Sequence, residues 1–473
     1  MAREKLILHP DRFFDTSPKV NKIAKELYAS VKNTPILSPH GHVNPVIFSD
    51  PNYKFGNPAE LFIIPDHYLF RMLYSQGIPM ESLGVPRIDG GPVETDPKKI
   101  WKTFADNFYL YRGTPTGIWF EYGLKEVFNI KYRLCAETAM GIYSEIDEKL
   151  KSPEFSPRAL YKKFNIELLA TTDAATDTLE HHKKIRDSGW NGRIIPTFRP
   201  DGVIDLSDKN WKNNIEVLAG FSKITITDYS SYINAIKNRR QYFKAMGATA
   251  ADIVALYPVT EELPQQEADR IFKKALSEGA SQEETNRFTA HIIMEMVRLS
   301  VEDGLVMQFH VGCYRNHNRE VFEKFGPDKG CDMPLSIEFT KSLQPLLNKY
   351  GNNPGFSIIC FTLDETNYSR ELAPLAGHYP AMKVGPAWWF HDSINGMQRY
   401  RQQVIETAGL YNTTGFVDDT RAFLSIPARH DLSRRIDANW IAGLVAKNII
   451  TMNDGFEMIQ DTAYRLAKKA YRL

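Results

Sequence analysis

The chain has 473 residues, 43% of them hydrophobic and 24% charged, a composition typical of a globular protein that buries a substantial core. Its 58 Lys and Arg residues balance 57 Asp and Glu residues, which excludes a strong overall field that would attract nucleic acid or an anionic membrane. No apolar run is long enough for a secretory signal or a bilayer span. We therefore expect a cytoplasmic protein with neither a nucleic-acid nor a membrane partner.

Short apolar, β-rich segments recur along the chain and are separated by helical patterns. One such helical pattern covers 281–301, where Ser281 and Glu284 form a capping box and Gly304 marks the end of the helix. The fourth β-rich segment is Ala-rich and also fits a helix. The eight candidate strands are 34–38, 167–171, 193–198, 245–254, 305–309, 356–362, 381–384 and 414–417.

Eight strands that alternate with helices predict an α/β fold, a closed (β/α)8 TIM-like barrel in which the C-terminal ends of the strands gather at one face. An open doubly wound sheet is the alternative. Residues 46–166 are too many for a plain connection and are rich in Trp, Tyr and Phe, so they predict a largely helical insertion after the first strand. Residues 202–244 indicate a second insertion. No linker divides the chain, and we expect residues 1–473 to form a single domain.

Two histidines, His40 and His42, follow the first strand at a spacing that places both side chains on one face of an extended chain. Asp419 follows the last strand, which neighbours the first in a closed barrel. Two neutral imidazoles and one carboxylate suit a borderline divalent ion that keeps open positions for water or substrate. These three residues are the predicted metal ligands. His310, after the fifth strand, is either a further ligand or a residue that orients a loop by a hydrogen bond.

Two arginines follow other strands, Arg199 after the third and Arg421 after the eighth. A guanidinium group can bind a carboxylate through two parallel hydrogen bonds, which indicates an acidic substrate. The alternative for each arginine is an internal salt bridge to a local acid such as Asp201 or Asp418.

Aromatic residues also stand near the ends of the predicted strands. Trp388 and Trp389 follow the seventh strand, and His67 stands beside Tyr68 early in the long insertion. His67 and Tyr68 are near enough in sequence to the first strand to fold over its C-terminal end. Such a pair is by itself more typical of the hydrophobic core than of a catalytic site.

Blocks of sequence in the same order along nearly the whole chain resemble the uronate isomerase (glucuronate isomerase) family, a divergent branch of the amidohydrolase superfamily. WWF followed by D-T-R-x-F-L-S is specific, whereas HxH alone fits the whole superfamily. The blocks are HGH at 40–42, DHY at 66–68, TTD with LEHH at 171–182, RPD at 199–201, QFHVG followed by RN at 308–316, WWFHD at 388–392 and DDTRAFLS at 418–425.

The resemblance implies an aldose–ketose isomerase that converts D-glucuronate to D-fructuronate and D-galacturonate to D-tagaturonate. It also implies one divalent metal ion, commonly zinc. The residues fall into three overlapping sets: metal ligands His40, His42 and Asp419; catalytic residues Asp419, Tyr68 and His67; and substrate-binding residues Arg199, Arg421, Trp388, Trp389 and His310.

Moving a proton from C2 to C1 requires a base, a donor and a group that stabilises the enediolate. Our hypothesis is that Tyr68 shuttles this proton, that Asp419 assists ring opening or proton relay, and that the metal or His67 steadies the oxygens. Because the pKa of a free tyrosine is near 10, Tyr68 would need a cationic neighbour, for which His67 and Arg421 are candidates.

The chain also departs from the superfamily pattern. Ser38 stands where the first motif often has an Asp, and the fourth strand offers no Lys or Glu at its end, which favours one metal and counts against hydrolysis. The rival functions are a metal-dependent hydrolase of a lactone or amide of a small acid, and a sugar-acid binding protein. The preferred uronate stays open, and a homo-oligomer is possible.

Overall fold

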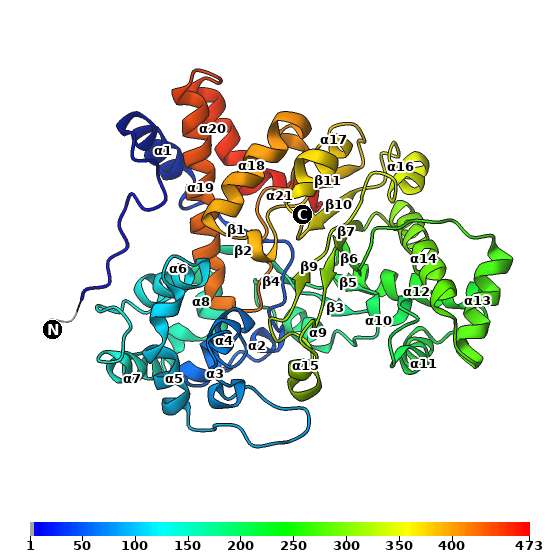
Figure 1. Cartoon of the computed structure of the whole chain (residues 1–473), viewed down its shortest axis with the longest axis horizontal. Coiled ribbons are helices and arrows are strands. Elements are labelled where there is room, and N and C mark those ends of the chain that lie inside the picture. Colours follow the sequence, from blue (N-terminus) through cyan, green and yellow to red (C-terminus); the bar gives the residue numbers. More distant parts are fainter. Residues whose placement is uncertain (1–3) are drawn as a thin grey trace.

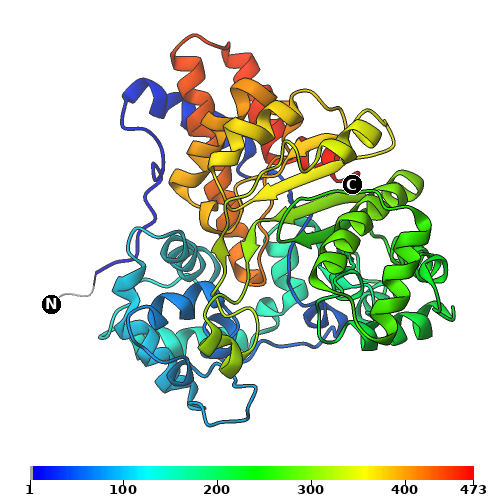
Figure 2. The same cartoon turned by 45° about the vertical axis from the view of Figure 1, so that its right-hand side comes forward.

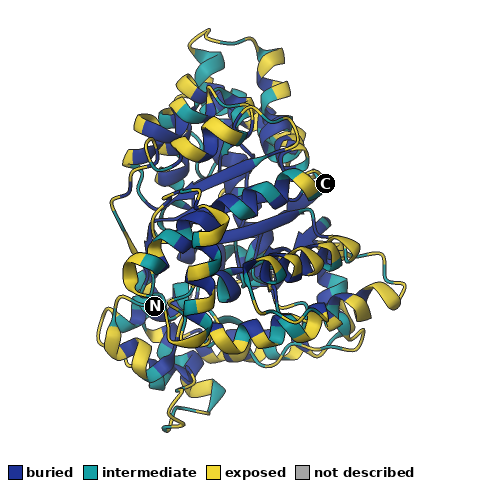
Figure 3. Cartoon of the chain, turned by 90° about the vertical axis from the view of Figure 1, so that its right-hand side faces the viewer, coloured by how far each residue is buried: buried dark blue, intermediate teal, exposed yellow. Residues whose placement is uncertain are grey.

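A computed structural model describes residues 4–473, an α/β structure in which a parallel sheet is surrounded by helices (Figure 1). The strands lie in the buried interior, and the helices around them expose their outer faces (Figure 3). The parallel strands are β1 (Ile36–Ser38), β2 (Ile166–Ala170), β3 (Asp173–Ala174), β4 (Arg193–Ile195), β5 (Phe198–Arg199), β6 (Ala250–Ala255), β7 (Val306–Val311), β10 (Ile358–Thr362) and β11 (Met382–Val384).

The helices of the first half of the chain are α1 (Pro18–Val31), α2 (Val46–Ser49), α3 (Pro58–Phe62), α4 (His67–Tyr74), α5 (Pro97–Asp106), α6 (Pro115–Tyr122), α7 (Ala139–Leu150), α8 (Pro157–Lys163), α9 (Glu180–Asp187), α10 (Asp201–Ile204), α11 (Trp211–Ser222) and α12 (Tyr229–Ala245). Those of the second half are α13 (Gln265–Ser277), α14 (Gln282–Asp303), α15 (Arg319–Phe325), α16 (Gln344–Tyr350), α17 (Ala373–Ala376), α18 (Ile394–Ala408), α19 (Ile426–Ala446), α20 (Met452–Gln460) and α21 (Leu466–Ala470). Within the described residues, no helix combines the length and the apolar character needed to cross a membrane.

The strands neighbour one another in chain order, as in a TIM-like barrel. β1, β2 and β4 form one hydrogen-bonded group, and β3, β5, β6, β7, β10 and β11 form the other. The two groups are continuous, because the Thr171 N–H donates to the Ile195 carbonyl at 2.9 Å and the Thr197 N–H donates to the Thr171 carbonyl at 3.0 Å. The expected third strand at 193–198 is divided into β4 and β5, since Pro196 between them has no N–H to donate.

The prediction of an eighth strand at 414–417 is wrong. Within residues 4–473 this segment makes no strand ladder, and only a parallel bridge between Val384 and Thr413 joins it to β11. Gly415 explains the interruption, because its φ of +74° is incompatible with an extended strand. Further on, the Thr420 carbonyl accepts the His42 N–H at 3.0 Å. The segment therefore passes from β11 to the end of β1 in the place expected for the eighth strand.

Two further local predictions concern the helix at 281–301 and the fourth strand. The capping box on α14 is confirmed, since Ser281 and Glu284 exchange hydrogen bonds and Gly304 ends the helix at φ +77°. The fourth strand is shorter than expected, because the Ala-rich start of 245–254 completes helix α12 and a turn before β6 begins.

Residues 46–166 contain helices α2 to α8, which lie together beside the sheet, as the blue and cyan elements in Figures 1 and 2 show. They share a buried aromatic core that includes Trp101, Phe104, Phe120 and Phe128. Aromatic side chains of this size supply a large apolar surface, which is why the segment folds as packed helices. The assignment of the whole chain to a single domain stays a prediction.

Helix α19 is buried along most of its length and carries several charged residues into the interior. One of them, Asp437, accepts two hydrogen bonds from Arg401 of α18, at 2.7 and 2.9 Å, and both side chains are about 5% exposed. A buried charge is tolerated when it is paired in this geometry.

Replacing Asp437 with Asn should therefore lower the free energy of unfolding by about 3–5 kcal/mol, because Arg401 would keep a buried charge without its partner. Urea denaturation followed by circular dichroism measures this change. A loss below about 1 kcal/mol would mean that water or another acid compensates Arg401.

Candidate active site

The three predicted metal ligands meet in the structure. His42 Nε2 lies 3.2 Å and His40 Nε2 lies 3.5 Å from Asp419 Oδ1, and one ligand atom of each residue lies within 4.8 Å of the others. His40 is buried, whereas His42 and Asp419 are partly exposed toward a cavity. Two imidazoles and a carboxylate at this spacing fit one divalent cation with an open side.

The electrostatics of this group also favour a cation. Burial acts to raise the pKa of Asp419, but the neighbouring imidazoles outweigh it and hold that pKa well below its usual range. Burial acts to lower the pKa of His40, but the carboxylates of Asp419 and Asp252 outweigh it and raise that pKa. The two carboxylates thus draw positive charge to the position where the imidazoles converge.

Gly41 explains why the two histidines can approach Asp419. A Cβ at this position would lie 3.3 Å from the Thr420 carbonyl oxygen and 3.6 Å from Asp418 Oδ1. The absence of a side chain lets the end of β1 approach the segment 418–421, where the His42 N–H reaches the Thr420 carbonyl.

Ser38 has a clear role beside this group. Its hydroxyl donates to Asp418 Oδ1 at 3.1 Å, and the His430 Nε2 lies 3.0 Å from Asp418 Oδ2. Both oxygens of the buried Asp418 are thereby held, which fixes the backbone next to Asp419. This matters because Asp419 has a φ of +37°, a conformation that a non-glycine residue adopts only where its neighbours enforce it.

Trp388 binds one oxygen of the Asp419 carboxylate. Its indole N–H donates to Asp419 Oδ2 at 2.7 Å, which leaves Oδ1 directed at the histidines. Trp388 therefore orients a predicted metal ligand, and its predicted contact with substrate stays a prediction.

His310 is buried behind His40, and their rings stack with centroids 4.9 Å apart. Its Nδ1 bonds Asp252 Oδ1 at 2.6 Å, and Arg199 lies 3.6 Å from Asp252 Oδ2. Asp252 lies on β6, and the sequence analysis missed it because it stands inside the weak Ala-rich segment. Arg199 makes the internal salt bridge that was its alternative, since its Nε donates to Asp201 at 2.6 Å.

A cavity opens over Asp419 and His42, and five other predicted residues line it: His67, Tyr68, Trp388, Trp389 and Arg421. His40, His310 and Arg199 are not part of this lining. The cavity walls also include residues that the sequence analysis did not single out, Arg315, Asp328 and Asp332, from the segment around the β8–β9 hairpin (Cys313–Tyr314 and Met333–Pro334). Arg315 stands within the QFHVG-RN block, so the motif was visible although its role was not.

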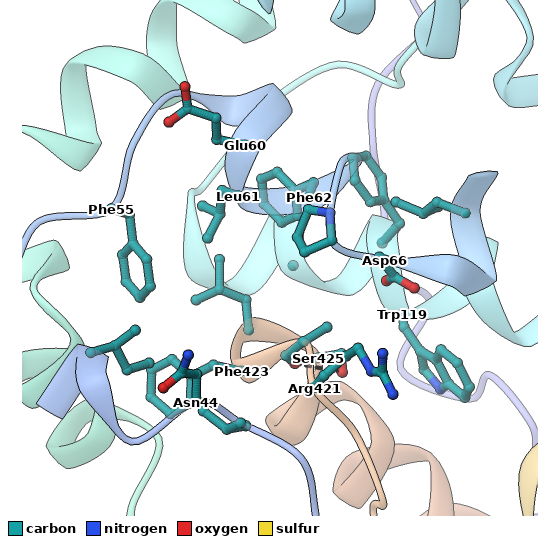
Figure 4. Close-up of a pocket in the computed structure, with 18 of the residues that line it drawn as sticks. Asn44, Phe55, Glu60, Leu61, Phe62, Asp66, Trp119, Arg421, Phe423 and Ser425 are labelled. Carbon is teal, nitrogen blue, oxygen red and sulfur yellow. Dashed lines mark hydrogen bonds between the residues drawn. The ribbon is translucent and has the colours of Figure 1, made fainter. Parts of the chain in front are cut away.

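Arg421 faces acids of this segment and not Asp201 or Asp418. Its NH2 lies 3.6 Å from Asp328 Oδ2, beyond hydrogen-bonding distance. It also lines a second cavity of about 290 Å³ with largely apolar walls, where Figure 4 shows it close to Trp119. A guanidinium group held by one long ion pair, as Arg421 is by Asp328, can still bind an incoming carboxylate.

His67 and Tyr68 stand at the start of α4, where Asp66 caps the helix by accepting the Tyr68 N–H at 2.8 Å. Their rings stack with centroids 4.9 Å apart, and Trp389 packs 4.3 Å from the Tyr68 ring. Burial, aided by Arg421, lowers the pKa of His67 to about 3, and burial raises the pKa of Tyr68. The lowered pKa favours a neutral His67 near pH 7 and counts against the hypothesis that His67 is the cation beside Tyr68.

Comparison with known proteins decides the family. Residues 13–471 match the model of the family described as glucuronate isomerase. The chain belongs to the glucuronate isomerase family. The expected resemblance is thus confirmed over nearly the whole chain.

Individual members of the glucuronate isomerase family match this chain over nearly its full length. The uronate isomerase of Nostoc punctiforme is 51% identical over all of both chains. The crystal structure of glucuronate isomerase from Caulobacter crescentus superimposes with a TM-score of 0.97 at 46% identity, covering 99% of this chain and 98% of that one. The uronate isomerase structure from Thermotoga maritima gives 0.91 at 28% identity, covering 98% and 99%.

Replacing Gly41 with Ala should lower metal affinity about tenfold without unfolding the protein, because the new Cβ would displace the Thr420 carbonyl beside the ligands. Competition with a chromophoric chelator measures the affinity. Gly443→Ala is the matched control, since a Cβ there meets no atom within 4 Å. Equal affinities of the two variants would contradict this account of Gly41.

The imidazole of His67 should stay neutral as pH falls through 6.5 and become protonated only near pH 3, because burial and Arg421 disfavour its charged form. Nitrogen-15 NMR of labelled histidine reports this, with His67→Gln used to assign the signal. A midpoint near 6.5 would show that His67 is solvated.

Proposed function

We propose that this protein is a uronate isomerase that interconverts D-glucuronate with D-fructuronate and D-galacturonate with D-tagaturonate, by transfer of a proton from C2 to C1. The observation that carries the proposal is the single cavity in which His42, His67, Tyr68, Asp419 and Arg421 face one another. Membership of the glucuronate isomerase family supports it. The substrate is then a hexuronate with one carboxylate and a reactive C1–C2 end.

Arg421 is the proposed partner of the substrate carboxylate. It lines the cavity. Its NH2 lies 3.6 Å from Asp328, whereas the Nε of Arg199 donates to Asp201 at 2.6 Å, so Arg421 is the less tightly held of the two arginines. Arg315 is held at 3.3 Å from Asp332 on the same wall and adds positive charge there. Binding at this end places C1 and C2 toward Asp419 and Tyr68.

Tyr68 is the proposed proton carrier. Its raised pKa keeps the phenol protonated near pH 7, so that it can deliver a proton to C1, and it can receive the C2 proton only as its own proton leaves. His67, neutral and stacked on Tyr68, can donate a hydrogen bond to a substrate oxygen without adding charge. Trp389 packs against both rings and limits the positions that they can take.

His40, His42 and Asp419 would hold the divalent ion, which we propose to be a single zinc. A cation there supplies electrostatic stabilisation to sugar oxygens. A second ion at His310 and Asp252 is disfavoured, because these side chains are bonded to each other and Arg199 adds positive charge 3.6 Å from Asp252. Asp419, held by Trp388, is also the proposed group for opening the sugar ring.

The hydrolase alternative is not favoured, since the matching family and the relatives of high identity are isomerases. A cytoplasmic location and a homo-oligomeric state stay predictions.

Replacing Tyr68 with Phe should reduce isomerisation by roughly 100-fold or more and abolish solvent deuterium incorporation at C1 and C2, because among the described residues no other tyrosine lines the cavity. Proton NMR of D-glucuronate in deuterium oxide measures both. Tyr232→Phe is the control, since it removes the hydroxyl of another buried tyrosine, one that donates to the Val203 carbonyl in the core and does not line the cavity. Full exchange by the Tyr68 variant would remove Tyr68 from the role.

A further inference from the structure

A buried ion pair lies directly behind Tyr68. Arg429, at the start of α19, donates through NH1 to Asp392 Oδ2, and its guanidinium carbon lies 3.5 Å from the Trp119 ring centroid and 5.1 Å from the Tyr68 ring centroid. Its Nε also donates to Ser425 Oγ at 3.2 Å, and NH1 donates to the Asp418 carbonyl at 3.3 Å. Arg429 is therefore fixed from several sides.

The second oxygen of Asp392 is not used by this pair. Asp392 is 4% exposed, and within residues 4–473 its Oδ1 has no hydrogen-bond partner. An unpaired oxygen on a buried carboxylate is costly, so it calls for a ligand or a function.

Asp392 lines a small cavity together with Tyr68. Asp392, Tyr68, Asp419 and Arg429 all contribute to the walls of a cavity of about 10 Å³. This is the space that one water molecule needs, and the polar groups around it can supply the two or more hydrogen bonds that a buried water makes.

We propose that Asp392 accepts the proton of Tyr68 through one water in this cavity, and that Arg429 positions Asp392 for this task. The inference rests on the proposed function. It answers a question that the mechanism leaves open, namely where the proton of a protonated Tyr68 goes when the phenol receives another from the substrate.

The transfers balance without any further reactant. As the C2–H bond breaks, its proton joins Tyr68 Oη and its electron pair stays on the substrate as the enediolate. The original phenol proton passes to the water, and a water proton passes to Asp392 Oδ1. In the second half, Tyr68 delivers a proton to C1 while Asp392 returns its proton through the water to Tyr68 Oη.

The charged groups around Tyr68 are consistent with transfer of its proton to Asp392. The charged groups around it include Arg429, Arg71, Asp392, Asp419 and Asp66, while the lowered pKa of the stacked His67 favours its neutral form. Burial raises the pKa of Asp392 to about 7, with Asp418 and Asp419 acting in the same direction and Arg429 opposing them. An acceptor of this pKa is ionised at and above neutral pH and can hold a proton transiently.

The test compares kcat, KM and the pH dependence of kcat for the metal-loaded full-length enzyme and its variants, with D-glucuronate as the probe. Asp392→Asn should lower kcat on the order of 100-fold and leave KM within about threefold. The wild-type kcat should fall below about pH 7, because a protonated Asp392 cannot accept a proton, and this acid limb should vanish in the variant. Formate should restore activity at least tenfold to Asp392→Ala.

Asp437→Asn is the matched control, because it also removes one acid of a buried ion pair, and neither Asp437 nor Arg401 lines either cavity. Its kcat should stay within about threefold of the wild-type value. Equal losses in the Asp392 and Asp437 variants, or an unchanged acid limb in Asp392→Asn, would overturn the proposal. If the Asp392 variants do not fold, the absence of an acid limb near pH 7 in the wild-type enzyme overturns it. A wild-type enzyme that leaves hexuronates unchanged would instead refute the proposed function.

Discussion

The site depends on the approach of segment 418–421 to the end of β1. One backbone hydrogen bond, from the His42 N–H to the Thr420 carbonyl, joins the two, and Gly41 leaves room for it. Because this segment makes no ladder with its neighbours, side chains fix it instead: Ser38 and His430 on Asp418, and Trp388 on Asp419. The cost of the left-handed backbone at Asp419 is offset by these contacts, which aim its carboxylate at both histidines.

A second principle is the compensation of buried charge around the reacting position. Asp252 is paired with His310, and Asp418 with His430. Each pair is buried: the first lies behind the predicted ligand His40, and the second holds the segment that carries Asp419. Asp392 differs in that Arg429 uses one of its oxygens, while the other has no partner within residues 4–473 and the residue lines a small cavity together with Tyr68. The unpaired oxygen and the shared cavity together make Asp392 the proposed proton acceptor.

Much of this arrangement was accessible from sequence. The apolar runs located seven of the eight expected strand positions, and strand order alone was enough to bring His40, His42 and Asp419 together. The strand prediction for 414–417 failed because the residues around Gly415 are apolar and β-rich, whereas Gly415 has a positive φ and packs where a Cβ would lie 3.0 Å from the Thr462 carbonyl. Asp392 stands in the WWFHD block, which did not reveal its role, whereas Arg429 was missed for another reason. Charged residues on a helix normally indicate a solvated face, and only the packing of α19 against the rest of the chain shows that this face is buried.

The roles assigned to the cavity can be tested together by a single assay. Protein of measured metal content is incubated with D-glucuronate and, separately, with D-galacturonate, and the sugars are followed by NMR. The account predicts that the corresponding ketose, D-fructuronate or D-tagaturonate, appears from at least one of them and that its rate of formation scales with the fraction of chains that carry one ion. No ketose from either uronate, together with hydrolysis of a sugar lactone, would contradict the account.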